Sequence, residues 1–153
     1  MVKTEHRRSI GAIATFATFL LISAVVFLPG CGVLGLTGGK PAGKVSFVEP
    51  KDGASVVSPF TVKMDATGVK VEPASAGVNK NAGHHHIIID AALPPPGSPV
   101  PSDAQHKHFG LGQTETVLDL PVGQHTLRLS FADGKHNPLD PAVTSTIKVT
   151  VVK

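Results

Sequence analysis

Tryptophan and tyrosine are absent from the 153-residue chain, and cysteine occurs once, at Cys31. A single cysteine excludes a disulfide within the chain. Without the two largest aromatic residues, a core must be built from aliphatic side chains and the seven phenylalanines. Glycine and proline are instead abundant, with 16 and 13 residues, which favours turns and short strands over long helices.

The chain also has little net charge once the N-terminal segment is set aside. The whole chain has 14 Lys and Arg against 11 Asp and Glu. Residues 1–30 hold three of the bases and one of the acids, which leaves 11 bases and 10 acids in the remainder. A nearly neutral domain lacks the basic surface that nucleic acid requires, so we expect no nucleic-acid partner.

Residues 1–30 have the organisation of an export signal. A basic start is followed by an apolar run over 10–28 and by Leu28-Pro29-Gly30-Cys31. This junction resembles a bacterial lipobox, with Leu at −3 and Gly at −1, although Pro29 at −2 departs from the pattern. The resemblance implies removal of residues 1–30 and acylation of Cys31. More than one acyl chain gives stable membrane anchoring.

An uncleaved transmembrane anchor is the alternative, because an apolar run of about nineteen residues can span a bilayer. Both interpretations place the remainder outside the cytoplasm, on the periplasmic side of a membrane or at the cell surface. Residues 31–43 are rich in glycine and predict a flexible tether. Residues 44–153 then form the folded domain.

The sequence of this domain predicts an all-β fold. No stretch shows sustained helical periodicity, whereas short segments alternate apolar and polar residues, as in a strand with one buried face. Roughly seven short strands joined by turns suit an immunoglobulin-like antiparallel β-sandwich. We expect the inward-facing residues to include Phe60, Val62, Met64, Leu118, Leu127, Leu129, Phe131, Ile147, Val149 and Val151.

Residues 120–127 resemble the corner between strands E and F of such sandwiches. His125 lies where a tyrosine often lies, and we expect it to hydrogen-bond back across the corner. Residues 91–105 form a long connection with five prolines, which cannot be a central strand. Long loops on a small sandwich often carry function.

Histidine is concentrated in two clusters, over residues 84–86 and 106–108. Each cluster contains the pattern His-x-His. Alternate residues of a strand point to the same face, about 7 Å apart, so both imidazoles of a pair can reach one ion. Neutral imidazole suits copper, zinc and nickel.

The alternation within each strand selects the candidate ligands. His85 shares a face with Ile87 and Ile89, so we expect it to be buried, most simply with a hydrogen bond to the backbone. The outer face would then expose the flanking histidines, although Ile88 lies on that face too. The predicted ligands of a copper or zinc ion are His84, His86, His106 and His108, and His136 is a further candidate from another loop.

The histidines are also compatible with two roles that need no metal. They could form a hydrogen-bonded network that fixes the proline-rich loop, or they could recognise another ligand. The chain has no G-x-S-x-G, no H-E-x-x-H and no free thiol once Cys31 is acylated, so we do not expect an enzyme. Glu115 and Asp90 could accept hydrogen bonds from the ring nitrogens that do not bind the metal, or could be ordinary surface residues.

The histidine clusters and their surroundings resemble the domain of unknown function 4399 family of exported bacterial proteins. The resemblance rests on Gly83–Asp90, on Gln105–Thr116 with its HxHFGxGQTE motif, and on Leu120–Leu127. It implies an extracytoplasmic β-domain and no particular chemistry. The family often has a second histidine where this chain has Leu139-Asp140, a departure that weighs against His136 as a ligand.

Two functions are therefore expected from the sequence. One is a membrane-anchored extracytoplasmic lipoprotein domain that binds copper or zinc. The other is a non-catalytic structural or interaction module of the cell envelope, with an unidentified envelope protein as partner.

Overall fold

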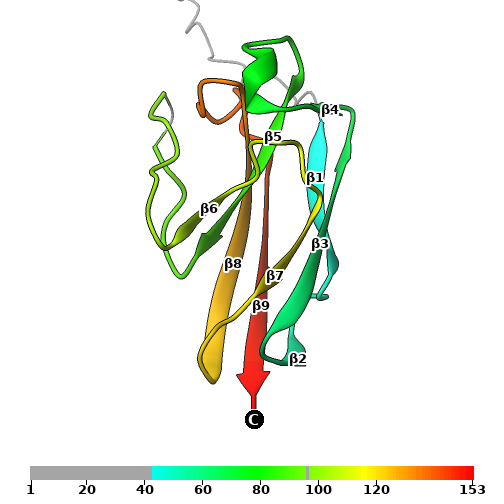
Figure 1. Ribbon diagram of the computed structural model, residues 1–153, viewed down its shortest axis with the longest axis vertical. Coiled ribbons are helices and arrows are strands. Elements are labelled where there is room, and N and C mark those ends of the chain that lie inside the picture. Colours follow the sequence, from blue (N-terminus) through cyan, green and yellow to red (C-terminus); the bar gives the residue numbers. More distant parts are fainter. Residues whose placement is uncertain (1–42, 96) are drawn as a thin grey trace, which may run out of the picture. The chain divides into compact units, whose positions relative to one another are not determined.

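Two β-sheets pack against each other in residues 43–95 and 97–153, the part of the chain that this computed structural model describes (Figure 1). The predicted signal segment, the lipidation residue Cys31 and the tether up to residue 42 lie outside the described residues. The all-β sandwich predicted from the sequence is confirmed.

The smaller sheet has three antiparallel strands in the order β1-β3-β7. Strand β1 covers Lys44–Glu49, β3 covers Phe60–Thr67 and β7 covers Glu115–Leu118. Strand β3 is central, so β1 and β7 form the two edges of this sheet.

The larger sheet has six strands, and its continuous path runs in the order β2-β9-β8-β5-β4. Strands β5, β8 and β9 pair antiparallel, whereas β2 runs parallel to β9 and β4 parallel to β5. Strand β6 also pairs with β5, in antiparallel orientation, and it contacts residues of β5 that follow the two residues paired with β4. The bounds are Ala54–Val57 for β2, Lys70–Val71 for β4, Ala82–Ile89 for β5, His106–His108 for β6, Gly123–Ala132 for β8 and Thr144–Val152 for β9.

Three stretches differ from the sequence-based expectation. Strands β2 and β4 were not predicted, because β2 ends in two adjacent valines instead of alternating and β4 has only two residues. Strand β5 begins at Ala82, upstream of the predicted apolar run, so the whole histidine triplet lies within a strand. A short 3-10 helix, Ala74–Ala76, lies in the connection between β4 and β5.

The hydrophobic core lies between the sheets and contains every residue predicted to face inward. Val62, Leu127, Leu129 and Phe131 have no exposed surface. Alternation along each strand explains this burial, since every second side chain points toward the facing sheet. From β5 the core takes Ile87 and Ile89.

His125 closes the corner at the start of β8, as predicted. Its Nε2 lies 2.9 Å from the carbonyl oxygen of Pro121, and its Nδ1 lies 2.7 Å from Oδ2 of Asp90. The bond to Asp90 is the main cause of a raised pKa at His125, opposed in part by burial. Burial alone would raise the pKa of Asp90, but the hydrogen bonds from His125 and the Thr126 N–H outweigh it and lower that pKa.

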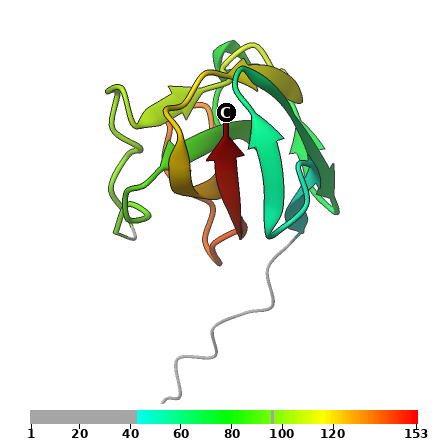
Figure 2. The same ribbon diagram turned by 90° about the horizontal axis from the view of Figure 1, so that it is seen from below.

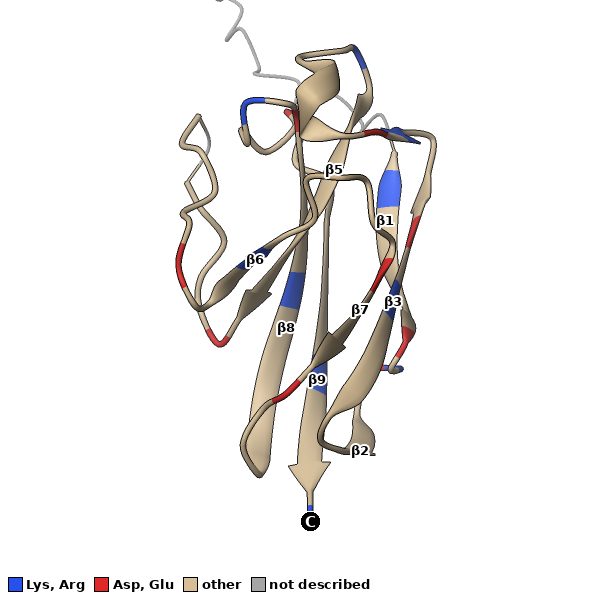
Figure 3. Cartoon of the chain, viewed as in Figure 1, with Lys and Arg blue, Asp and Glu red and all other residues tan. Residues whose placement is uncertain are grey.

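Basic and acidic residues are interspersed over the strands of both sheets, and neither sign gathers on one element (Figure 3). Among the described residues, no helix is long and apolar enough to cross a membrane. The apolar run at residues 10–28, which the transmembrane alternative requires, is outside that part of the chain.

Two connections cover the outer face of the larger sheet, opposite the core. The first joins β5 to β6 and carries the prolines, and the second joins β8 to β9 (Figures 1 and 2). The backbone N–H of Val100 in the first donates to the carbonyl oxygen of His136 in the second, at 2.9 Å. Arg128 on β8 ties the proline-rich connection down by donating to the carbonyl oxygen of Ala91, at 2.8 Å.

Candidate metal centre

Strand β5 positions two of the predicted ligands on its outer face. Because Ile87 and Ile89 face the core, His84 and His86 project to the other side. Their predicted exposure is wrong, since His84 is 0% and His86 1% exposed. The two loops that cover this face bury both histidines. An apolar residue on the same face, Ile88, was the sequence signal that could have indicated such a cover, and it is fully buried.

Strand β6 brings the second cluster to the first. Its antiparallel register places His108 directly opposite His86, and His106 opposite Ile88. The proline-rich connection therefore returns the chain along β5 far enough for one imidazole of β6 to reach the β5 pair. His108 is more exposed than its partners, so it forms the outer side of the group.

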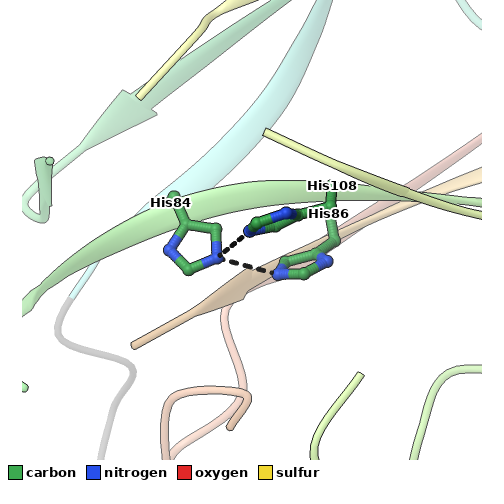
Figure 4. Close-up of side chains that lie close together, drawn as sticks. All are labelled: His84, His86 and His108. Atoms are coloured by element: carbon green, nitrogen blue, oxygen red, sulfur yellow. Dashed lines mark hydrogen bonds between the residues drawn. The ribbon is translucent and has the colours of Figure 1, made fainter. Parts of the chain in front are cut away.

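The three imidazoles of His84, His86 and His108 converge on one another (Figure 4). Nε2 of His84 lies 3.0 Å from Nε2 of His86 and 3.2 Å from Nε2 of His108. One ring nitrogen from each residue lies within 4.8 Å of the other two. An ion bound tetrahedrally at about 2.0–2.1 Å to each imidazole holds their nitrogens about 3.3 Å apart. The spacing of this group could therefore hold a metal ion.

The protonation of the group favours metal binding. Burial, with a smaller contribution from the neighbouring imidazoles, lowers the pKa of His84 to about 4 and that of His86 to about 3. Burial and the imidazole of His136 also lower the pKa of His108. The rings are therefore neutral near pH 7, and neutral imidazole is the form that ligates a metal.

The opposite ring nitrogens of the buried pair have no partner among the described atoms. Nδ1 of His84 and Nδ1 of His86 are buried without a hydrogen bond, and so is the hydroxyl of Ser130, the cross-strand neighbour of His86. Unpaired buried polar atoms are costly in free energy.

His106, the fourth predicted ligand, is not brought into the group. Its Nδ1 lies 2.7 Å from Oδ1 of Asp103, and its backbone N–H donates to the carbonyl oxygen of the same residue. The side-chain bond is the main reason for a lowered pKa at Asp103. A carboxylate three residues upstream thus orients this ring locally.

His136 does lie beside the group, in spite of the sequence argument against it. Its Nε2 is 3.2 Å from Nε2 of His108, and its ring centroid is 5.2 Å from that of His84. A pocket of about 330 Å³ opens next to these rings and is lined by His86, His108, His136 and residues 99–102. The outer side of the group is therefore accessible from solvent.

His85 points into the core, as its alternation with Ile87 and Ile89 predicts, and it is fully buried. The expected hydrogen bond to the backbone is absent, because neither ring nitrogen has a partner among the described residues. Its ring packs edge-on against Phe131 at a centroid distance of 5.1 Å. Burial lowers its pKa to about 4, so the ring is neutral and behaves as a core aromatic.

One solved structure shows a distant similarity. It is the endo-beta-1,4-mannanase from Thermotoga petrophila, with 18% identity and a TM-score of 0.43, over 72% of this chain and 20% of that chain. This chain thus spans about a fifth of that enzyme's length. No curated protein matches the sequence.

The family comparison covers most of the domain described above. The model of the domain of unknown function DUF4399 matches residues 62–152, which include both histidine clusters, the proline-rich connection and His136. The resemblance found in the sequence motifs is thereby confirmed. This chain belongs to the DUF4399 family.

Proposed function

We propose that the domain binds one transition-metal ion, copper or zinc, through His84, His86 and His108. The observation that carries the proposal is the pair of Nε2–Nε2 separations of 3.0 and 3.2 Å around His84. Two of these imidazoles are buried, and all three have lowered pKa values. Three neutral nitrogens within 4.8 Å of one another are a ligand set for a borderline-soft cation.

A hydrogen-bonded histidine network accounts less well for the same contacts. Each Nε2 offers either one proton or one lone pair, never both. The contacts run from His86 to His84, on to His108, and from there to His136. If donors and acceptors alternate along this row of four Nε2 atoms, only two of them carry a proton, so at most two of the three contacts can be full hydrogen bonds. One cation satisfies converging lone pairs without such sharing.

The chemistry of the ligands predicts which metal ions bind most tightly. Three imidazoles without a thiolate suit Cu(II) and Zn(II), and nitrogen sites bind Cu(II) more tightly than Zn(II). Calcium and magnesium prefer oxygen ligands, which the group does not contain. The proposal assigns binding to the site and no catalytic step.

A competitive titration tests this function. The full chain, purified in detergent without immobilised metal, is titrated with Cu(II) and Zn(II) against a chromogenic chelator. We expect one equivalent to bind with a Kd far below millimolar, and His108→Ala to weaken it by at least about tenfold. His106→Ala, on the same strand and two residues away, is the matched control and should bind as the unchanged protein does.

Two results would overturn the proposal. One is binding no tighter than millimolar, and the other is an equal loss in the two variants. Either would leave the second function, a non-catalytic structural or interaction module of the cell envelope with a protein partner. That module would be recovered by crosslinking in the envelope and would have a stability indifferent to metal.

We also propose that the domain is exported and held at a bacterial membrane by acyl chains on Cys31. The support is the leader sequence ending in Leu28-Pro29-Gly30-Cys31. In a bacterial host, mass spectrometry of the unchanged protein should show that residues 1–30 are removed and that Cys31 carries acyl chains, and Cys31→Ser should show neither. An unchanged protein that keeps residues 1–30 and has no acyl chain would favour the transmembrane anchor instead.

A further inference from the structure

We infer that His136 is a fourth ligand of the same ion and closes its coordination sphere against water and small anions. The inference rests on the proposed metal site and concerns what the bound ion can do. A four-coordinate ion with four protein ligands is saturated, whereas a catalytic ion keeps one position open. Four imidazole ligands would therefore fit a domain that carries or stores the metal, whereas three would leave a position at which the ion could bind and activate another molecule.

The first observation is the position of the ring. His84, His86 and His108 form the group whose ligand atoms lie within 4.8 Å of one another, and His136 extends it on the exposed side, next to His108. Nε2 of His136 is 3.2 Å from Nε2 of His108, and the two ring centroids are 4.7 Å apart. Since His136 is not one of the three residues whose ligand atoms lie within 4.8 Å of one another, its ring has to turn toward them to ligate the same ion.

The second observation is the backbone of His136, which has a φ of +66°. Residues with a side chain seldom adopt this left-handed conformation, but histidine does so more often than most, and Asn81 and Asp90 share it in this protein. The turn around it is well fixed. His136 N–H donates to the carbonyl oxygen of Asp133, and the Asp133 carboxylate accepts from the N–H groups of Lys135 and Asn137.

The third observation is that this turn is held from both sides. On one side, the N–H of the buried Val100 donates to the carbonyl oxygen of His136. On the other side, Gly134 packs so closely on Gly77 that a Cβ at Gly134 would overlap the Gly77 carbonyl group. The fold thus keeps this imidazole at the mouth of the pocket, where a fourth ligand is needed.

The resulting ligand set has a defined chemistry. Four neutral imidazoles, without a carboxylate among them, fit a tetrahedral Zn(II) or a tetragonal Cu(II) ion. The pocket beside His108 and His136 becomes the route by which the ion enters and leaves. Exchange of the ion then requires His136 to turn away first.

Electron paramagnetic resonance of the Cu(II)-loaded full chain tests the inference. His136→Asn is the informative variant, because asparagine tolerates the left-handed backbone of this turn. We expect nitrogen hyperfine structure from four imidazoles in the unchanged protein and from three in His136→Asn. Added azide should leave the first spectrum unchanged and shift the second. His106→Asn is the matched control and should behave as the unchanged protein does.

The outcomes separate this inference from the function on which it rests. An unchanged protein that binds no Cu(II) overturns both. A protein that binds Cu(II) with three imidazoles, or that accepts azide as readily as His136→Asn does, overturns the role of His136 alone. The number of imidazoles in the spectrum of the unchanged protein decides the matter even if His136→Asn folds poorly.

Discussion

His84 and His108 are 24 residues apart in the chain, and their Nε2 atoms lie 3.2 Å apart on the outer face of the larger sheet. This contact depends on the antiparallel pairing of β6 with β5, which places His108 opposite His86. The site is therefore assembled from two strands and lies under loops that bury the β5 pair. Its integrity can be tested at residues that are not ligands.

Gly110 is one such residue. A Cβ at this position would overlap the His108 imidazole, including its Nε2 atom. We expect Gly110→Ala to push the ring away from His84 and to weaken metal binding by at least about tenfold, as a misplaced ligand does. Because the obstacle is the end of a side chain, the fold should remain intact by circular dichroism.

Gly83→Ala provides the contrast. There a Cβ would overlap the backbone carbonyl of Ala132, which cannot rotate away. We expect this change to separate β5 from β8 and to destabilise the protein by at least about 1–3 kcal/mol, the usual cost of overpacking. If Gly110→Ala lowers stability as much and affinity no more than Gly83→Ala does, the steric account of His108 is wrong.

Val100 links the proline-rich connection to the site. Its side chain is 7% exposed, and its N–H donates to the carbonyl oxygen of His136. Val100→Ala should cost about 1–2 kcal/mol of unfolding free energy and speed the release of bound metal. Val122→Ala, at a side chain that is 60% exposed, is the control and should change neither urea unfolding nor release. Equal effects of the two variants would contradict a covering role for this loop.

The pH dependence of stability should reveal the pair of His125 and Asp90. His125 has a raised pKa, so its contribution is complete below about 6.5 and is lost as pH rises through the folded value. Asp90 has a lowered pKa, so its contribution is complete above about 3.9 and is lost as pH falls through the folded value. Between these limits we expect a coupling of about 1 kcal/mol, because Asp90 is 40% exposed.

Urea unfolding in a chelator, from pH 4 to 9, measures this coupling through a double-mutant cycle of His125→Gln and Asp90→Asn. The coupling energy should be largest near pH 5–6 and should diminish toward pH 9. A coupling that grows with pH would show that the pair does not depend on a protonated imidazole.

Much of the fold could be predicted from the sequence because each long strand has its own apolar pattern. Alternation identified the buried residues of β3, β8 and β9, and it placed His85 opposite to His84 and His86. The corner bond of His125 followed from its position alone. These features depend on residues close in sequence, which is where patterning is informative.

Most of the missing parts depend on contacts between distant segments. The register of β6 on β5 is determined by how the proline-rich connection folds back, and no local pattern encodes it. The bond between Asp103 and His106 is local, three residues apart, and was missed because it depends on the turn at the end of the proline-rich connection. Burial of His84 and His86 likewise required the two covering loops.

Metal binding should stabilise the folded state. An ion at about 100 times its Kd adds about 2.7 kcal/mol, which for a domain of this size corresponds to about 10 °C in Tm. Differential scanning calorimetry of the full chain, with Zn(II) or with a chelator, measures this shift. His108→Ala should lose most of it, and a similar shift in both proteins would place the stabilising ion elsewhere.

The most direct measurement is a crystal structure of the zinc-loaded protein, with anomalous data at the zinc edge. We predict one strong peak on the outer face of the larger sheet, about 2.0–2.1 Å from Nε2 of His84, His86 and His108. A peak bound by His106 and Asp103, or no peak among the β5 histidines in a crystal that contains stoichiometric zinc, would contradict the account.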